Sequence, residues 1–169
     1  TYAAGLNEDS IEPDTEFKNL EKKIYCSKFP IGEYDEKIPS DLTAEQILIR
    51  SGNIGSVRIA QKIGEKKFKS FLKKIGVIGN FEFDINEIAV NEDFSMGKCK
   101  LATASFGHGV TTTILQLAKG YSVLSNGGYN IKPKLILTDT QKSDNQKELI
   151  LKNGVSEQVV KILRKVVTE

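Results

Sequence analysis

Residues 41–77, DLTAEQILIRSGNIGSVRIAQKIGEKKFKSFLKKIGV, contain the helix signals that decide the fold. Thr43 and Gln46 have the S/T-x-x-E/Q spacing of a capping box, which predicts a short helix that ends near Arg50. Apolar residues then recur with a helical period in two further segments, Ile54, Val57, Ala60 and Ile63, followed by Phe68, Phe71, Leu72 and Ile75. Gly64 separates the two segments, as helix-terminating glycines do. The stretch therefore predicts three consecutive helices.

The flanking segments predict further helices and long connections. Residues 2–7 are typical of the tail of a helix, and residues 10–41 contain three of the four prolines, which indicates an irregular connection with short extended pieces. A second capping box, formed by Thr113 and Gln116, predicts a helix that stops at Gly127. Its expected buried face consists of Ile114, Leu117, Ala118, Tyr121 and Leu124.

The last part of the chain predicts one more helix and little sheet. Ser156 is expected to cap a helix whose apolar positions are Val159, Ile162, Leu163 and Val166. Residues 79–94 indicate a loop with at most a short strand, and residues 133–137 and 148–152 are candidate short strands. With four or five helices, the chain is expected to be mainly α.

Composition excludes several classes of protein. The 169 residues are 39% hydrophobic and 27% charged, which is ordinary for a soluble domain, and no apolar run approaches the roughly 20 residues that cross a bilayer. The net charge of +2 does not select a polyanionic partner. Cys26, Cys99 and the single histidine, His108, are too few and too far apart to predict a metal site, and no cofactor is expected. The two cysteines fit one disulfide or two thiols equally well.

Ser51-Gly52-Asn53 is the first candidate site. Serine and asparagine are favoured caps and glycine tolerates a tight turn, so the three residues fit a plain corner between helices. A serine hydroxyl and an asparagine amide separated by one residue also suit a catalytic site. A tight turn can direct both side chains into the same space, where the hydroxyl would relay a proton and the amide would both donate and accept hydrogen bonds.

Gly107-His108-Gly109 is the second candidate. His108 could act as a general base, but no carboxylate lies near it in the sequence, and a surface or cleft-lining position is the more common fate of such a histidine.

A rival interpretation concerns nucleic acid. Ala60 and Gly64, followed by a lysine-rich helix, have the spacing of a helix-turn-helix made of helices 54–63 and 65–75. Phe68 occupies a first turn of the would-be recognition helix, and no arginine or asparagine there could read base edges. Nucleic-acid binding is therefore the alternative and not the main prediction.

Taken in order, these segments resemble class B penicillin-binding proteins, in their cell-division, septum-building branch. Residues 41–77 are similar to the region around that family's S-x-N motif, here Ser51 to Asn53. Residues 102–136, ATASFGHGVTTTILQLAKGYSVLSNGGYNIKPKLI, are similar to its later glycine-x-glycine loop, T-P-L-Q-L-A helix and closing N-G-G. Residues 1–17 are similar to the segment on the C-terminal side of its S-x-x-K motif.

The resemblance implies a serine-type D,D-transpeptidase that cross-links peptidoglycan stem peptides and is acylated by β-lactams. Residues 1–169 would be part of the transpeptidase domain, a helical subdomain of an α/β, β-lactamase-like fold whose central sheet is largely absent here. Ser51 would help pass a proton to the leaving amine, Asn53 would hold the donor peptide's amide, and His108 would be a substrate-binding candidate. Divisome proteins would be partners of a parent anchored in the cytoplasmic membrane, with this domain facing the periplasm or cell exterior.

The sequence also departs from the family. No S-x-x-K occurs at a suitable place before Ser51, and K-S-G and K-T-G do not occur at all. Ile114 stands where the family usually has proline, and His108 where it usually has glutamine or tyrosine. We therefore expect the chain to be a piece of a longer enzyme, itself soluble, without an anchor and inactive alone.

Overall fold

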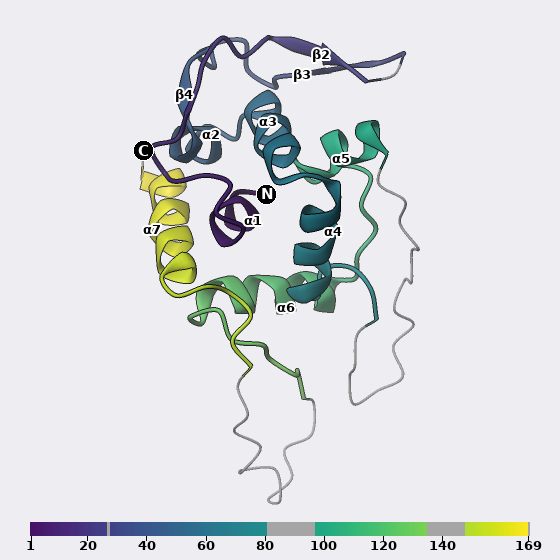
Figure 1. The fold of residues 1–169 in the computed structure, drawn as a ribbon, viewed down its shortest axis with the longest axis vertical. Coiled ribbons are helices and arrows are strands. Elements are labelled where there is room, and N and C mark those ends of the chain that lie inside the picture. The colour runs from purple at the N-terminus through teal and green to yellow at the C-terminus, as the bar shows by residue number, and fades with distance from the viewer. Residues whose placement is uncertain (27, 81–96, 135–147, 169) are drawn as a thin grey trace, which may run out of the picture.

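Helices make up most of the structure, a computed structural model that describes residues 1–26, 28–80, 97–134 and 148–168 (Figure 1). The helices are α1 (Tyr2–Asn7), α2 (Ala44–Ile49), α3 (Asn53–Ile63), α4 (Glu65–Lys74), α5 (Lys98–Ala104), α6 (Ile114–Ser125) and α7 (Val155–Thr168). The strands are β1 (Glu16–Phe17), β2 (Lys23–Tyr25), β3 (Pro30–Gly32) and β4 (Leu42–Thr43). The predicted fold class, mainly α with a few short strands, is confirmed.

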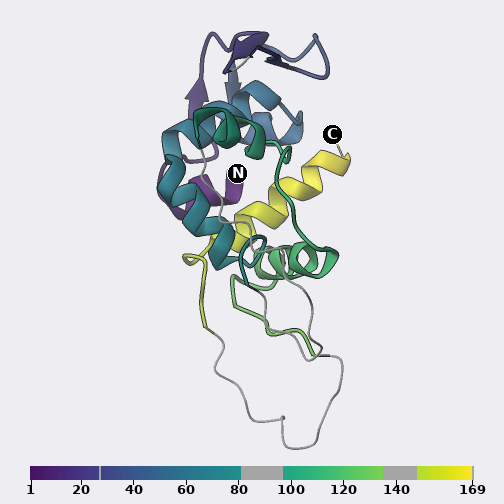
Figure 2. The ribbon, with the colours of Figure 1, turned by 90° about the vertical axis from the view of Figure 1, so that its right-hand side faces the viewer.

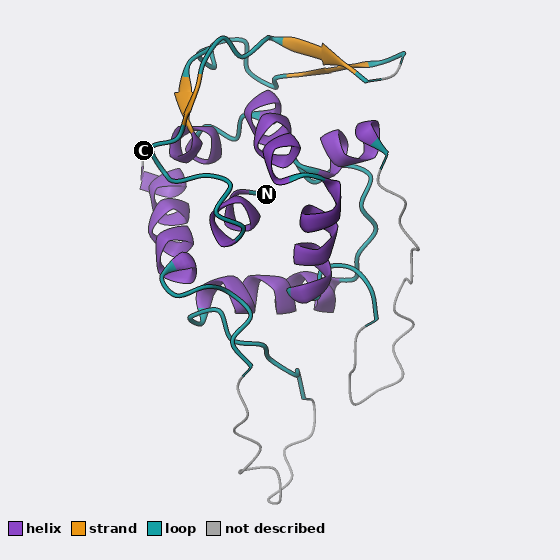
Figure 3. Cartoon of the chain, viewed as in Figure 1, coloured by secondary structure: helices purple, strands orange, loops and turns teal. Residues whose placement is uncertain are grey.

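The strands form two small antiparallel sheets. In the first, β1 pairs with β4, with Glu16 opposite Thr43. In the second, β2 and β3 form a hairpin in which Ile24 lies opposite Ile31. Figure 3 shows that all four strands lie at one end of the molecule, next to α2 and α3, and that helices make up the rest of the described elements.

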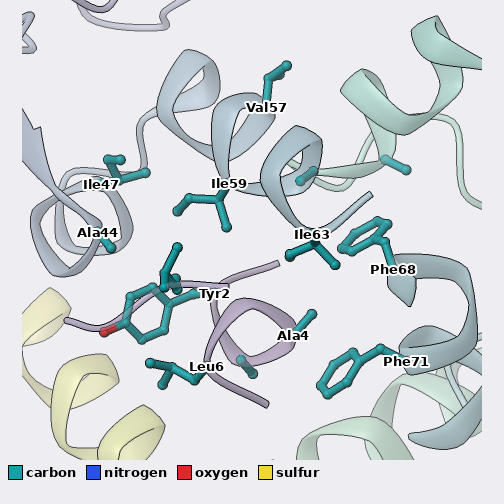
Figure 4. Packing of buried hydrophobic residues seen from close by; sticks show 14 of the residues in the cluster. Tyr2, Ala4, Leu6, Ala44, Ile47, Val57, Ile59, Ile63, Phe68 and Phe71 are labelled. Atoms are coloured by element: carbon teal, nitrogen blue, oxygen red, sulfur yellow. The ribbon is translucent and has the colours of Figure 1, made fainter. Parts of the chain in front are cut away.

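The core is organised around α1. Figure 1 shows this short helix in the middle of the molecule, with α2, α3, α4, α6 and α7 around it, and Figure 2 shows the same helices from the perpendicular direction. Helix α1 packs against α3 and α7, and all six of its residues are buried. Figure 4 shows Tyr2, Ala4 and Leu6 facing side chains of the surrounding helices, among them Ile59 and Phe71.

Helices α2 and α3 approach one another closely where the chain turns from one to the other. A Cβ atom on Gly55 would lie only 2.5 Å from the Cγ1 atom of Ile47, so only glycine fits here without a rearrangement. Ile47 and Ile54 are fully buried beside this contact. The close approach sets the angle of the corner that holds Ser51 to Asn53.

Most predicted elements are confirmed. Both capping boxes are present, with the side chains of Thr43 and Thr113 accepting hydrogen bonds from the backbone N–H groups of Gln46 and Gln116. Helix α1, the irregular region with short extended pieces, and the three helices of residues 41–77 also occur as predicted. Residues 81–94 and 135–137, on which parts of two strand predictions fall, lie outside the described residues.

Four local predictions are wrong. The expected buried face of α6 points outward: Ile114 is 88% exposed and Tyr121 58% exposed, whereas the buried residues are Gln116, Gly120 and Val123. Helix α7 already begins at Val155, so Ser156 lies inside its first turn, where its hydroxyl donates to the Leu124 carbonyl. Residues 148–152 contain one isolated bridge, between Tyr129 and Leu149, and no strand. The described residues form seven helices instead of the four or five expected, and one of them, α5, was not predicted.

The reasons for these differences are physical. Gly120 allows α6 to approach Val77 closely, and the Gln116 side chain donates to the Gly79 carbonyl at 2.8 Å. Together these contacts place the polar, small-residue face of α6 inward. Helix α5 is only seven residues long and has no side-chain cap at Gly97, so it lacks the start signal that sequence patterns offer.

Candidate active site

The S-x-N turn joins the end of α2 to the start of α3. Ser51 has a φ angle of +54°, a left-handed backbone conformation that residues other than glycine seldom adopt. Backbone hydrogen bonds hold it there: Ser51 N–H donates to the Leu48 carbonyl at 3.1 Å and Gly52 N–H to the Ile47 carbonyl at 2.9 Å. The turn presents the Ser51 side chain at the surface instead of continuing the helix.

Asn53 is the first residue of α3 and is held by the strand region that precedes it in sequence. Its backbone N–H donates to a carboxylate oxygen of Glu33 at 2.6 Å, and its side-chain Nδ2 donates to the Gly32 carbonyl at 2.9 Å. The described residues give its side-chain Oδ1 no hydrogen-bond donor. Asn53 therefore has a fixed orientation and an oxygen atom available to accept an N–H group.

A pocket of about 400 Å³ contains both residues. It lies where the start of α1, the corner between α2 and α3, the segment after α5 and one side of α6 meet. Its lining residues are Thr1, Tyr2, Ile47, Leu48, Ser51, Asn53, Ser56, Ile59, Ser105, Phe106 and Tyr121. The Thr1 hydroxyl donates to the Ser105 carbonyl and so connects the start of α1 to the segment after α5. The pocket is thus lined by both polar and apolar side chains, as is usual for ligand pockets.

His108 does not line this pocket. It lies in a second pocket of about 540 Å³, between the β2–β3 hairpin and α5. Phe106 lines both pockets, and its ring stacks on that of His108 with centroids 6.4 Å apart. The structure therefore brings Ser51 and Asn53 together in one pocket and places His108 in a second pocket that shares Phe106 with the first.

The second pocket also contains both cysteines, Cys26 and Cys99, as free thiols. The Cys99 thiol donates to the Cys26 backbone carbonyl. A hydrogen bond with Cys99, together with burial, raises the pKa of the Cys26 thiol to about 11. At neutral pH Cys26 is consequently protonated, which makes it a poor candidate for a nucleophile.

Sequence reasoning missed Glu33 and the residues after α5. Ser105 and Phe106 lie in the SFGHG segment, which pointed to the right part of the chain but singled out His108. Glu33 lies in an irregular region without periodicity, 20 residues before Asn53, so no local pattern indicated its contact with the turn. Among the residues that the structure describes, no three of the metal-binding types gather into a metal site.

The family model for the penicillin-binding protein transpeptidase domain matches residues 1–169. The chain belongs to this transpeptidase domain family. A peptidoglycan D,D-transpeptidase FtsI homolog from Mesostigma viride is 30% identical, and the match covers 75% of this chain and 22% of that protein. Penicillin-binding protein 3 from Bacillus subtilis is 27% identical, over 99% of this chain and 26% of that protein. The chain thus spans about a quarter of the length of these relatives.

Solved structures confirm the transpeptidase-domain fold. The apo transpeptidase domain of penicillin-binding protein 3 from Burkholderia pseudomallei superposes with a TM-score of 0.79, at 18% identity, over 98% of this chain and 50% of that one. A peptidoglycan glycosyltransferase from Burkholderia ambifaria gives a TM-score of 0.80, also at 18% identity, over 98% of this chain and 52% of that one. The predicted resemblance to class B penicillin-binding proteins of the cell-division branch is confirmed by the family match and by the FtsI relatives.

These comparisons give the helix-turn-helix alternative no support. The two helices do exist, as α3 and α4, but Phe68 and Phe71 of α4 are buried in the core, so one face of the would-be recognition helix is occupied. Within the described ranges, no helix combines the length and the apolar composition of a membrane-spanning segment.

Proposed function

We propose that this chain is part of a D,D-transpeptidase that cross-links peptidoglycan in cell division through an acyl-serine intermediate. The observation that carries the proposal is the convergence of Ser51 and Asn53 on one pocket, in a chain that matches the transpeptidase domain family along its whole length. The substrates would be peptidoglycan stem peptides, and β-lactams would acylate the nucleophilic serine of the full-length enzyme, which is not Ser51. Residues 1–169 would form part of a single transpeptidase domain.

The reaction requires a nucleophile that Ser51 does not supply in this proposal. Transpeptidases of this family use the serine of an S-x-x-K motif, whose lysine activates the hydroxyl for attack on the D-Ala-D-Ala carbonyl. No such motif precedes Ser51 in residues 1–169. The nucleophile and its lysine would therefore come from a part of the protein outside these residues.

Ser51 and Asn53 would have separate tasks in the acyl transfer. The hydroxyl of Ser51 can both donate and accept a hydrogen bond, so it suits the transfer of a proton from the nucleophile's surroundings to the leaving amine. Asn53 would accept an N–H of the donor peptide at Oδ1, because the bond from its Nδ2 to the Gly32 carbonyl orients the amide and leaves Oδ1 without a donor among the described residues. The fixed orientation of Asn53 would then hold the scissile bond in place.

His108 would contact parts of the substrate that extend past the active-site pocket. Its pocket adjoins that pocket through Phe106, so a long peptide could run from one to the other. We further propose that divisome proteins are partners of the full-length enzyme. It would be anchored in the cytoplasmic membrane, with this domain on the outer side.

The proposal can be tested with a fluorescent penicillin. The full-length protein is incubated with the label, separated on a denaturing gel, and the labelled peptide is identified by mass spectrometry. We expect one covalent label, on a serine outside residues 1–169, and no label on residues 1–169 alone. A label on Ser51 would contradict the assigned roles, and the absence of any label on the folded full-length protein would contradict the activity.

A further inference from the structure

Three consecutive residues, Gly32, Glu33 and Tyr34, hold both sides of the S-x-N turn. The Gly32 carbonyl accepts a hydrogen bond from Asn53 Nδ2, and the Tyr34 hydroxyl donates to the Arg50 carbonyl at 3.3 Å. Arg50 and Asn53 flank the Ser51-Gly52 pair. Residues 32–34, at the end of the β2–β3 hairpin, therefore form hydrogen bonds with the residues on both sides of the turn. They do not line the pocket that contains Ser51 and Asn53.

Glu33 makes the strongest of these contacts. One carboxylate oxygen accepts the N–H of Asn53 at 2.6 Å and the other accepts the N–H of Ile54 at 3.0 Å. The residue that precedes α3, Gly52, has no side chain to cap the helix. Glu33, 20 residues earlier in the sequence, thus provides the missing cap of α3. Its negative charge lies at the N-terminal end of the helix, where the helix dipole stabilises negative charge.

The contact bears on the geometry of the site and not only on the stability of the helix. Asn53 is held at its backbone by Glu33 and at its side chain by Gly32, so these neighbours together fix where Oδ1 lies. Ser51, two residues before, has a left-handed backbone conformation, so a shift of Asn53 would also displace the Ser51 side chain. Without the Glu33 carboxylate, two N–H groups at the start of α3 lose their acceptor, and the turn is free to relax.

We propose that Glu33 is a positioning residue for the acyl-transfer site. It keeps Asn53 and Ser51 of the S-x-N turn in the positions from which they line the pocket. This inference rests on the proposed function. Glu33 does not line the pocket, so it does not contact the substrate. Its effect reaches the reaction through the main chain of Asn53.

The test compares the second-order rate of acylation by a fluorescent penicillin among variants of the full-length protein. Glu33→Ala removes both acceptors and should lower the rate by about tenfold to hundredfold, as small displacements of catalytic groups do. Glu33→Gln keeps the shape and one acceptor oxygen, but it turns an NH2 group toward the other N–H, so an intermediate rate is expected. Amide hydrogen exchange at Asn53 and Ile54 should speed up in both variants.

Two control variants separate positioning from a general loss of stability. Ile63→Val trims a buried side chain at the far end of α3, so it should lower the melting temperature and leave the acylation rate unchanged. Glu36→Gln removes an exposed carboxylate from the same loop and should change neither quantity.

The outcomes are distinguishable. If the wild-type protein is not acylated, the proposed function fails. If the wild-type is acylated and folded Glu33→Gln reacts at the wild-type rate with unchanged exchange at Asn53, the positioning role of Glu33 is wrong. If Glu33→Ala does not fold, the acylation rate and amide exchange of Glu33→Gln alone test the positioning role. If Ile63→Val slows acylation as much as Glu33→Gln at an equal loss of melting temperature, the role is merely structural.

Discussion

Ser51 combines a backbone conformation that lowers stability with a side chain to which we assign a role in the proposed reaction. Its left-handed backbone costs about 1–2 kcal/mol for a residue with a Cβ atom, yet a glycine, which would avoid this cost, has no hydroxyl. Strained conformations of this kind often mark functional sites. A serine at this position is best explained by a use for its hydroxyl in the pocket.

The strain predicts the relative stability of two variants that both lack the hydroxyl. Ser51→Gly should be more stable than Ser51→Ala by about 1 kcal/mol, because glycine adopts positive φ angles freely and alanine does not. Urea unfolding of the two variants measures the difference. Equal midpoints, or a more stable Ser51→Ala, would show that Ser51 is not held in the left-handed conformation.

Tyr2 gives a pH-dependent prediction. Burial, reinforced by the carboxylates of Glu45, Glu12 and Asp14, raises the pKa of its phenol above the ordinary value, and its hydroxyl has no hydrogen-bond partner among the described residues. Above about pH 10 the unfolded chain loses this proton while the folded protein keeps it, so the free energy of unfolding falls as pH rises. Tyr2→Phe removes this loss and breaks no hydrogen bond.

Melting temperatures of wild-type and Tyr2→Phe, measured between about pH 8 and pH 11, check this sign. Groups common to both proteins cancel in the difference. We expect the melting temperature of Tyr2→Phe, relative to wild-type, to rise once the pH passes about 10. A difference that stays constant across the range would mean that the Tyr2 phenol titrates alike in both states.

The site could be predicted at the residue level only where its parts are close in sequence. Ser51 and Asn53 were predicted because three consecutive residues form the motif. Glu33 could not be, because the contact depends on how the β2–β3 hairpin folds back onto α3, and a glutamate in an irregular segment is ordinarily a solvated surface residue. For the same reason His108 was chosen from its local surroundings, although Phe106 is the residue that lines both pockets.

At the level of elements, the caps were predictable and the orientation of a helix was not. Thr43 and Thr113 cap their helices through groups three residues away, which the sequence displays directly. The buried face of α6 depends on Val77 and the Gly79 carbonyl, which lie more than 30 residues earlier. Apolar periodicity favoured the opposite face.

Gly120→Ala tests the observed orientation of α6. Helix propensity alone predicts that alanine stabilises a helix by about 1 kcal/mol. In the structure, however, a Cβ on Gly120 would lie 2.6 Å from Val77 Cγ2, so overpacking should lower the free energy of unfolding by about 1–3 kcal/mol. Urea unfolding measures the change.

Ile114→Gln is the matched control on the exposed face of the same helix and should change the free energy of unfolding by no more than about 0.5 kcal/mol. If Gly120→Ala proved stabilising and Ile114→Gln strongly destabilising, α6 would pack through the face that the sequence pattern predicted.

At the scale of the whole molecule, the fold class was predictable and the arrangement was not. Helical periods and the order of the motifs indicated a helical part of a transpeptidase domain. They gave no sign that α1 would lie inside the other helices, because its enclosure depends on distant contacts. One of these is the bond from the Lys152 N–H to the Asn7 side-chain oxygen at 2.9 Å, which joins residues 145 positions apart.

The enclosure of α1 bears on the proposed function because the first residues of the chain, Thr1 and Tyr2, line the same pocket as Ser51 and Asn53. Residues that lie some 50 positions apart in the sequence thus meet at one site. We propose that Ser51 and Asn53 take part in acyl transfer at this site and do not merely form a corner between two helices.

The roles of Ser51 and Asn53 can be measured through the rate at which a labelled penicillin acylates the full-length protein. Ser51→Ala should lower the rate by about a hundredfold or more, as the loss of a proton-transfer group does. Asn53→Ala should lower it by about tenfold or more, and Ser40→Ala, at an exposed serine of the preceding loop, should have no effect. Folded Ser51→Ala and Asn53→Ala proteins that react as fast as wild-type would contradict the account.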